Sequence, residues 1–222
     1  MPAKSFNEYA EDYDKWFDSP VGGVLFRLEV EAVSLLAKGL EPPFLEIGVG
    51  TGRFAEALGI GFGLDPSTDM LKLAKKRGIK VKKGKGEKLP FENESFGAVF
   101  LLFTLCFVDD AEKVLSEAKR VLNKEGGLIV GFINRDSLWG LLYMKKKTEG
   151  HPIYRHARFY SVREVVALIE DTGLRVEAFS STLCRPPSDR PQGEAVHDRL
   201  VEDAGFVCIR SRKIDRGEKN GG

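Results

Sequence analysis

A short apolar run that ends in three glycines limits the fold of this chain more than any other stretch. Residues 44–47 (FLEI) precede Gly48, Gly50 and Gly52, and Glu46 lies two positions before the first glycine. The pattern predicts a buried strand, a tight turn and the start of a helix, because glycine adopts positive φ angles and lets a ligand approach the backbone. Unpaired N–H groups at the start of that helix favour a small-molecule site at the turn.

The spacing of these glycines does not fit a dinucleotide site. The dinucleotide fingerprint is G-x-G-x-x-G, and counting from Gly48 its third glycine would fall on Arg53. A carboxylate at Glu46 would also repel a pyrophosphate and attract a positively charged ligand. S-adenosylmethionine (SAM) carries a sulfonium and an ammonium group and no phosphate, so we favour SAM over a nicotinamide dinucleotide.

The glycine turn resembles the first motif of the class I SAM-dependent methyltransferases. Asp65 follows Gly48 by 17 residues at the end of the next predicted strand, and residues 84–91 (GKGEKLPF) and 120–127 (RVLNKEGG) resemble further segments of the same family. Together these features cover about residues 40–133 and most resemble the type 11 family, which is related to the methyltransferases of ubiquinone and menaquinone biosynthesis. The resemblance is specific for the fold and the cofactor, and it leaves the substrate open.

The resemblance implies which residues bind SAM. The glycine turn would contact the methionine part, the Asp65 carboxylate would accept both ribose hydroxyls, and Pro66 and Met70 would pack on the adenine. The family often has an aspartate that accepts from the adenine amino group, but this chain has Lys85 there, which leaves Glu87 as the candidate substitute. The predicted cofactor-binding residues are Tyr13, Trp16, Glu46, Gly48, Val49, Gly50, Arg53, Asp65, Pro66, Met70, Gly86, Glu87 and Thr104.

The segment after the fourth predicted strand, residues 104–108 (TLCFV), is apolar and uncharged. In the family this segment lies under the transferring methyl group, so we expect a small or apolar acceptor. It lacks the [DNS]-P-P-[YFW] pattern of enzymes that methylate nucleic-acid bases. Methyl transfer is a displacement at a carbon already activated by the sulfonium, so the sequence assigns no catalytic base. The predicted acceptor-binding residues are Phe107, Trp139, Tyr143, Tyr154 and Arg158.

The composition limits which binding partners and which cellular compartment we expect. The chain has 34 Lys and Arg against 33 Asp and Glu, a net charge of +1, which gives no electrostatic signature of nucleic-acid or membrane binding. Three widely spaced cysteines predict reduced thiols and no metal site, and no apolar run approaches the ~20 residues of a membrane span. We therefore expect a cytoplasmic monomer or homodimer. The single glutamine among many Lys and Glu residues points to a thermophilic source.

The function that fits best is methyl transfer from SAM to a small-molecule acceptor, with S-adenosylhomocysteine (SAH) as the product. Two alternatives stay open. One is a methyltransferase that acts on RNA or protein, and the other is a SAM-binding sensor or assembly protein without transfer activity.

Hydrophobic periodicity predicts one α/β domain over residues 1–212. Residues 1–40 would form a helical cap, residues 134–160 an irregular acceptor-side insertion and residues 213–222 a polar tail. The predicted strands are 44–47, 60–65, 79–84, 97–104, 128–133, 174–182 and 205–212. The predicted helices are 5–18, 22–38, 53–58, 67–77, 110–122, 161–173 and a short one near 193–203. The resemblance implies a three-layer Rossmann-like, mostly parallel sheet with strand order 3-2-1-4-5-7-6 and an antiparallel last strand.

Overall fold

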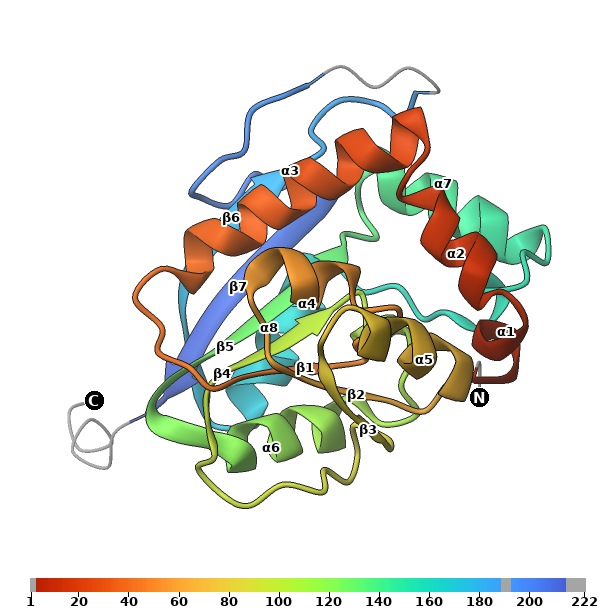
Figure 1. The fold of residues 1–222 in the computed structure, drawn as a ribbon. Helices are drawn as coiled ribbons and strands as arrows, with labels where there is room; N and C mark the ends of the chain where they lie inside the picture. Colours follow the sequence, from red (N-terminus) through yellow and green to blue (C-terminus); the bar gives the residue numbers. More distant parts are fainter. Residues whose placement is uncertain (1–2, 189–192, 215–222) are drawn as a thin grey trace.

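The computed structural model describes residues 3–188 and 193–214. Helices cover both faces of a seven-stranded sheet (Figure 1). The strands are β1 Phe44–Ile47, β2 Phe62–Asp65, β3 Lys80–Lys83, β4 Phe96–Leu102, β5 Leu122–Ile133, β6 Leu174–Thr182 and β7 Phe206–Lys213. The α-helices are α1 Ala3–Glu8, α2 Ala10–Trp16, α3 Pro20–Ala37, α4 Arg53–Leu58, α5 Thr68–Lys76, α6 Ala111–Val121, α7 Leu138–Thr148 and α8 Val162–Asp171, with 3₁₀ turns η1 Leu105–Phe107 and η2 Tyr154–His156.

The strand order is β3-β2-β1-β4-β5-β7-β6, and β7 runs antiparallel to the other strands. This order confirms the predicted three-layer Rossmann-like α/β fold with its antiparallel last strand. Strands β1 and β4 are neighbours in the sheet, although β2 and β3 lie between them in the chain. The connections therefore leave β1 and β4 in opposite directions, and open α/β sheets bind ligands at such a point.

Side chains alternate along β4 between two hydrophobic clusters. Ala98, Phe100 and Leu102 belong to the cluster beneath α3, α4 and α5, whereas Val99 and Leu101 belong to the cluster beneath α6 and α8. Because helices cover both faces, every residue of β4 is buried. The central position of β4 places the residues that follow it in the middle of the ligand-binding edge.

Two segments that pack at the carboxyl end of the sheet differ from the prediction. Residues 5–18 do not form one helix, because α1 and α2 are separate helices that meet at Tyr9. Residues 134–160 are not irregular throughout, since they contain α7, which lies close to α2 in Figure 1. Ser137 caps α7 by accepting the N–H of Gly140 at 2.9 Å, and this Ser was an available signal for a helix start.

Two further differences concern the second half of the chain. Residues 123–127, which lie between a predicted helix and a predicted strand, belong to β5, and the Leu40 side chain packs where a Cβ of Gly127 would lie. The short helix predicted near 193–203 is wrong, because His197 instead exchanges backbone hydrogen bonds of 2.9 Å with Ser181 of β6. Residues 215–222 of the predicted tail lie outside the described residues.

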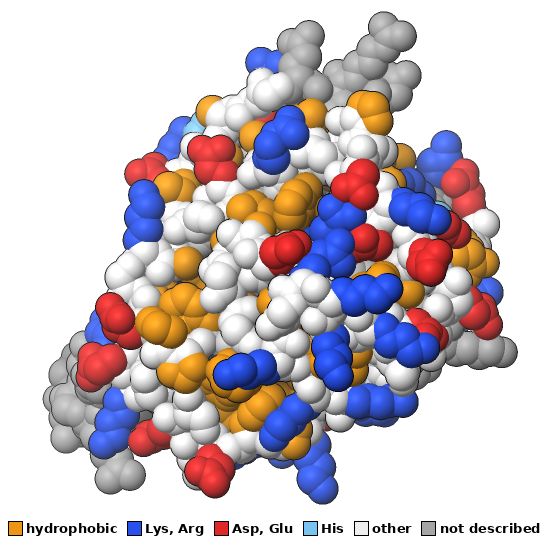
Figure 2. Space-filling view, in the orientation of Figure 1, with side chains coloured by type: hydrophobic (Ala, Val, Ile, Leu, Met, Phe, Trp, Pro, Cys, Tyr) orange, Lys and Arg blue, Asp and Glu red, His pale blue; other side chains and the backbone are white. Residues whose placement is uncertain are grey.

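The edge strand β3 carries exposed Lys80, Lys82 and Lys83, which protect an open sheet edge from pairing with other chains. Lysines gather over α5 and β3 at the lower right of Figure 2, while basic and acidic side chains are interspersed over much of the rest of this face. None of the helices in residues 3–188 and 193–214 combines the length and apolar character needed to cross a membrane.

Candidate cofactor and acceptor site

The glycine turn joins β1 to α4 and is pinned to the end of β4. Gly48 has φ +77°, and its N–H donates to Leu64 O at 2.7 Å. A Cβ at Gly48 would collide with the Thr104 side chain. The Thr104 hydroxyl lies 2.9 Å from Ile47 O and 3.0 Å from Leu102 O, so it connects the ends of β1 and β4. Glycine is thus required here by both the backbone angle and the close approach.

Asp65 is the last residue of β2, and its carboxylate holds the glycine turn in place. One oxygen accepts the N–H of Gly50 at 3.0 Å, and the other accepts the N–H of Ser67 at 2.8 Å. Burial raises the pKa of Asp65 to about 6, although these two hydrogen bonds act to lower it. Each carboxylate oxygen keeps a further acceptor position, so Asp65 can also bind hydroxyl groups of a ligand.

A cavity of about 110 Å³ lies between the glycine turn, the end of β2 and the end of β4. Most of the predicted cofactor residues line it, namely Tyr13, Gly48, Gly50, Asp65, Pro66, Met70, Gly86, Glu87 and Thr104. Sequence reasoning missed the apolar part of the lining, namely Phe6, Ile47, Leu64, Leu102, Phe103 and Val108. Lys85, the departure from the family pattern, also lines the cavity, and its Nζ lies 3.3 Å from Asp109 Oδ2.

Four predicted cofactor residues lie outside this smaller cavity: Trp16, Glu46, Val49 and Arg53. Trp16 lines a second cavity, described below, and Val49 packs against the backbone of Gly63. Glu46 is buried in the core, and its Oε2 has no hydrogen-bond partner in the described structure. Burial and the nearby Asp65 raise the pKa of Glu46 well above its ordinary value, and the N–H of Ala55 opposes this only in part. The charge of Glu46 therefore gives little support for a cationic ligand.

Arg53 binds the N-terminal helices and does not line either cavity. Its guanidinium donates to both Asp14 carboxylate oxygens at 3.0 and 2.9 Å and forms an ion pair with Asp18 at 2.7 Å. Arg77 at the end of α5 adds a third contact, because its Nη2 lies 2.9 Å from Asp14 and its Nη1 donates to Thr51 O in the glycine turn. We call these four residues, Asp14, Asp18, Arg53 and Arg77, the cap latch, since they fasten α2 to the cofactor side of the fold.

Replacing Asp14 by asparagine is expected to destabilise the fold by about 1–2 kcal/mol, because solvent screens part of the interaction that its shifted pKa reports. Burial alone would raise the pKa of Asp14, but hydrogen bonds from Arg53, Thr51 and Arg77 outweigh it and lower the pKa to about 2. Because the pKa is lowered in the folded state, this stabilisation is present above about pH 4 and is lost as the pH falls towards 2. Urea unfolding at pH 7 and pH 3 measures the effect, which should be large at pH 7 and smaller at pH 3.

Glu11→Gln is the matched control, because Glu11 lies on the same helix in an exposed pair with Lys15. It should change the free energy of unfolding by less than about 0.5 kcal/mol. Equal effects of the two substitutions at pH 7 would show that the cap latch does not hold α2.

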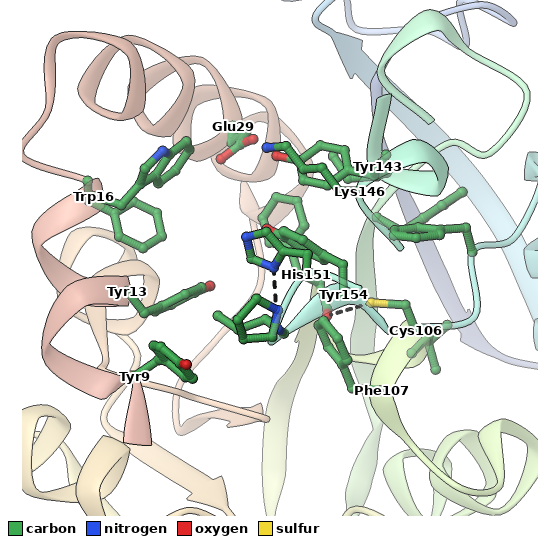
Figure 3. Close-up of a pocket in the computed structure, with 18 of the residues that line it drawn as sticks. Tyr9, Tyr13, Trp16, Glu29, Cys106, Phe107, Tyr143, Lys146, His151 and Tyr154 are labelled. Carbon is green, nitrogen blue, oxygen red and sulfur yellow. Dashed lines mark hydrogen bonds between the residues drawn. The ribbon is translucent and has the colours of Figure 1, made fainter. Parts of the chain in front are cut away.

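A larger cavity of about 350 Å³ adjoins the first. Figure 3 shows Tyr9, Tyr13 and Trp16 on one side and Cys106 and Phe107 on the other, with Glu29 of α3 and Tyr143 of α7 at one end. Aromatic rings contact one another around it, with centroids 4.8 Å apart for Tyr143 and Tyr154 and 6.3 Å apart for Phe107 and Tyr154. Its volume and mostly apolar wall are typical of a small-molecule site.

The two cavities share a wall made by Tyr13, Phe103 and Phe107. Phe103 has φ +55°, which is rare for a bulky residue. Its N–H donates to Gly131 O at 2.8 Å, and its ring stacks on Phe206 with centroids 5.0 Å apart. Packing thus holds Phe103 in a strained conformation at the junction of the cavities, where such strain commonly marks a functional site.

Two of the predicted acceptor residues lie away from the larger cavity. Trp139 is buried against the backbone of Gly205, and its indole N–H donates to Arg185 O at 2.8 Å. The exposed Arg158 side chain lies over the ring of Tyr160, with Cζ 4.9 Å from the centroid. The structure brings Phe107, Tyr143 and Tyr154 together and leaves Trp139 and Arg158 out of the lining.

Three groups in the wall of the larger cavity, one thiol and two tyrosine hydroxyls, are poor bases or nucleophiles. Burial raises the pKa of the Cys106 thiol to about 12 and raises the pKa values of the Tyr13 and Tyr143 hydroxyls, so all three are neutral at pH 7. Burial and nearby Lys146 lower the pKa of His151. In the described ranges, no group of three or more His, Cys, Asp or Glu side chains could hold a metal ion.

Comparison with known proteins identifies the fold family. Residues 45–130 match the family of type 11 methyltransferase domains. A crystal structure of a SAM-dependent methyltransferase from Thermotoga maritima, described as a possible histamine N-methyltransferase, matches with a TM-score of 0.89. The two chains are 39% identical, and the match covers 96% of this chain and 100% of that one. This chain belongs to the type 11 family of SAM-dependent methyltransferases.

Other relatives of this type 11 methyltransferase agree with the assignment. An uncharacterised protein of Mycobacterium tuberculosis is 46% identical over 94% of this chain and 74% of its own length. A ubiquinone/menaquinone biosynthesis C-methyltransferase of Desulfotalea psychrophila is 40% identical over 78% of this chain and 69% of its own length. The family implies SAM as the methyl donor.

Proposed function

We propose that this type 11 methyltransferase transfers the methyl group of SAM to a small molecule held in the larger cavity. The observation that carries the proposal is the shared wall of Tyr13, Phe103 and Phe107. It places one cavity beside the glycine turn and Asp65, and an aromatic cavity directly next to it. A donor in the first and an acceptor in the second would meet at this wall.

The residues of the smaller cavity fit SAM. A Cβ added to Gly50 would meet no atom within 4 Å, so the turn leaves open space where a ligand can approach the backbone. The remaining acceptor positions of Asp65 suit the two ribose hydroxyls, and Pro66 and Met70 supply an apolar surface for the adenine. When bound, SAM supplies a methyl group on a sulfonium, which is a good leaving group.

The protein contributes position and exclusion of water. Tyr13 and Phe107 belong to both linings, so they can restrict how an acceptor faces the cofactor cavity. Holding two reactants in the correct geometry supplies several kcal/mol of the barrier reduction. The aromatic side chains of this wall help to keep bulk water from the reacting atoms.

The size of the larger cavity supports a small acceptor over RNA or a protein. Its volume of about 350 Å³ is close to the lower end for drug-sized ligands. The Thermotoga relative, described as a possible histamine N-methyltransferase, supports the same size class.

Formation of SAH from SAM in the presence of candidate acceptors tests the proposal. We expect an acceptor-dependent release of SAH, measured by mass spectrometry, with at least one compound from a panel of amines, phenols and thiols or from a small-molecule cell extract. Stoichiometric SAM binding without SAH release from either source would favour the non-catalytic sensor instead. Release that depends only on added RNA or protein would favour a macromolecular acceptor.

A further inference from the structure

Glu29 is a buried carboxyl group at the larger cavity. It lies on α3 among buried apolar residues such as Leu25, Leu28 and Ala32, and its exposed fraction is 5%. Figure 3 shows its carboxyl group directed to the same space as the Tyr143 ring. Among the described residues, none donates a hydrogen bond to Glu29 or forms an ion pair with it. The fold therefore buries an unpaired acid whose free side faces the cavity.

Such a group is unfavourable unless something binds it. Burying a polar group without a hydrogen bond costs free energy, and burying a charge costs more unless it is paired. Burial accordingly raises the pKa of Glu29 to about 8. An apolar residue at this position of α3 would pack among the same neighbours without that cost. A carboxyl group here is explained by a ligand that donates hydrogen bonds or carries positive charge.

The wall around Glu29 suits a cation. The faces of Tyr13, Trp16, Tyr143 and Tyr154 line the same cavity, and aromatic faces attract cations. The ammonium group of Lys146 already lies 4.9 Å from the ring centroid of Tyr143 and 5.9 Å from that of Tyr154. These rings therefore accept positive charge in the protein itself.

Above about pH 8, where Glu29 is ionised, the charged groups of the cavity sum to a negative field. Asp12 of α2 and Glu29 supply two carboxyl groups, against the single ammonium of Lys146, whose pKa burial lowers. His151 is neutral at pH 7, because burial and Lys146 lower its pKa. The Cys208 thiol of β7, which interacts electrostatically with Glu29, is neutral because burial raises its pKa.

We propose that Glu29 anchors an ammonium group of the methyl acceptor, so that the acceptor is a small cationic amine with an apolar or aromatic body. The methyl group goes to a different atom of the acceptor that keeps a lone pair, because an ammonium nitrogen has none. The inference rests on the proposed function and names the substrate class of the same cavity. Glu29 acts as a specificity-determining residue: its carboxylate pairs with the ammonium group while the surrounding rings bind the apolar body.

Binding of benzyltrimethylammonium tests this assignment, because its charge does not depend on pH and its nitrogen cannot accept a methyl group. We expect the wild type to bind it at least tenfold more tightly than Glu29→Gln, as measured by isothermal titration calorimetry at pH 8.5. The wild type should also prefer it at least tenfold over its neutral isostere neopentylbenzene, measured by competition. Equal affinities of wild type and Glu29→Gln, a preference for the neutral compound, or no binding of the cation would each overturn the proposal.

The pH dependence separates Glu29 from its charged neighbours. Wild-type affinity should rise as the pH increases from 6.5 to 9, because Glu29 loses its proton near pH 8 and only the carboxylate attracts the cation. Loss of the Lys146 proton would act in the same direction, so Lys146→Gln serves as the control and should keep the rise. Glu29→Gln should remove it. A rise that persists in Glu29→Gln would assign the effect to Lys146 and overturn the role of Glu29.

Titration of the same proteins with SAH distinguishes a failure of the proposed function from a failure of the role proposed for Glu29. Wild type and Glu29→Gln should bind SAH equally, which also shows that the variant is folded, since Glu29 does not line the cofactor cavity. Failure of the wild type to bind SAH would refute the proposed function while the cation result still stands. SAH binding without a cation preference would refute only the role of Glu29.

Discussion

Replacing Asp65 by alanine is expected to weaken SAM binding by about 2–4 kcal/mol, which is about 30- to 900-fold in the dissociation constant. The substitution removes the acceptor that fits two ribose hydroxyls, and hydrogen bonds to a charged group are among the stronger ones. It also releases the N–H groups of Gly50 and Ser67, which the carboxylate holds at 3.0 and 2.8 Å. Calorimetric titration with SAM and with SAH at pH 8 measures the loss.

The pH profile of SAM binding distinguishes the carboxylate from a general loosening of the turn. Burial raises the pKa of Asp65 to about 6, so wild-type affinity should be full above pH 7 and should fall as the pH drops through 6. Asp65→Asn keeps the size of the side chain but does not titrate, so its weaker affinity should be flat over the same range. An unchanged dissociation constant for Asp65→Ala would remove Asp65 from the cofactor site.

Replacing Gly50 by alanine is expected to weaken SAM and SAH binding at least tenfold while the protein stays folded. Gly50 has φ +53°, and an added Cβ would meet no protein atom within 4 Å. The protein therefore bears only the backbone strain, about 1–2 kcal/mol. The new methyl group lies in the cavity and would occupy space that the ligand needs.

Gly59→Ala is the matched control for this substitution. Gly59 caps α4 with φ +68° and also has no atom within 4 Å of an added Cβ, but it does not line the cofactor cavity. Both variants should lower the thermal midpoint by a similar amount, and only Gly50→Ala should lose affinity. Equal binding by both variants would mean that SAM does not approach the backbone at Gly50.

The sequence was sufficient to predict the fold because local and global signals agree. The alternation of strands and helices predicts the layers, the family resemblance supplies the strand order, and the structure confirms both. Asp65 and the glycine turn were found because strand ends are visible as apolar runs followed by turn residues. The position of such residues at the carboxyl ends of parallel strands is therefore accessible from sequence alone.

The remaining features of the site depend on contacts between distant parts of the chain. Arg53 follows the glycine motif, but its partners Asp14 and Asp18 lie far from it in the sequence. The local sequence therefore does not indicate that Arg53 forms ion pairs with the N-terminal segment. The sequence predicts that Glu46 is a charged group beside a ligand, whereas the folded sheet buries Glu46 and thereby raises its pKa. Burial decides the role of such residues, and burial depends on the packed fold.

The residues around the larger cavity also have positions that depend on contacts between distant parts of the chain. Glu29 has the pattern of an ordinary helix residue, and only the positions of α2, α3 and α7 make it part of a cavity. Trp139 was predicted to bind a ligand because it is aromatic, but its side chain instead packs against Gly205. A helix could have been predicted here, because Ser137 is a good N-cap residue and the following Trp139, Tyr143 and Lys146 are spaced by four and three residues. This pattern would have corrected the prediction of an irregular segment.

Under the proposed function, the cap latch would link donor binding to acceptor binding. Arg77 touches both Asp14 of the cap and Thr51 O of the glycine turn, so the conformation that holds α2 in place also holds the turn. Tyr13, one residue before Asp14, lines both cavities. Under the proposed function, a donor that stabilises the turn would therefore also stabilise the acceptor wall, and reciprocity would require that the acceptor strengthen donor binding by the same factor. We therefore expect positive cooperativity between donor and acceptor, whichever acceptor is used.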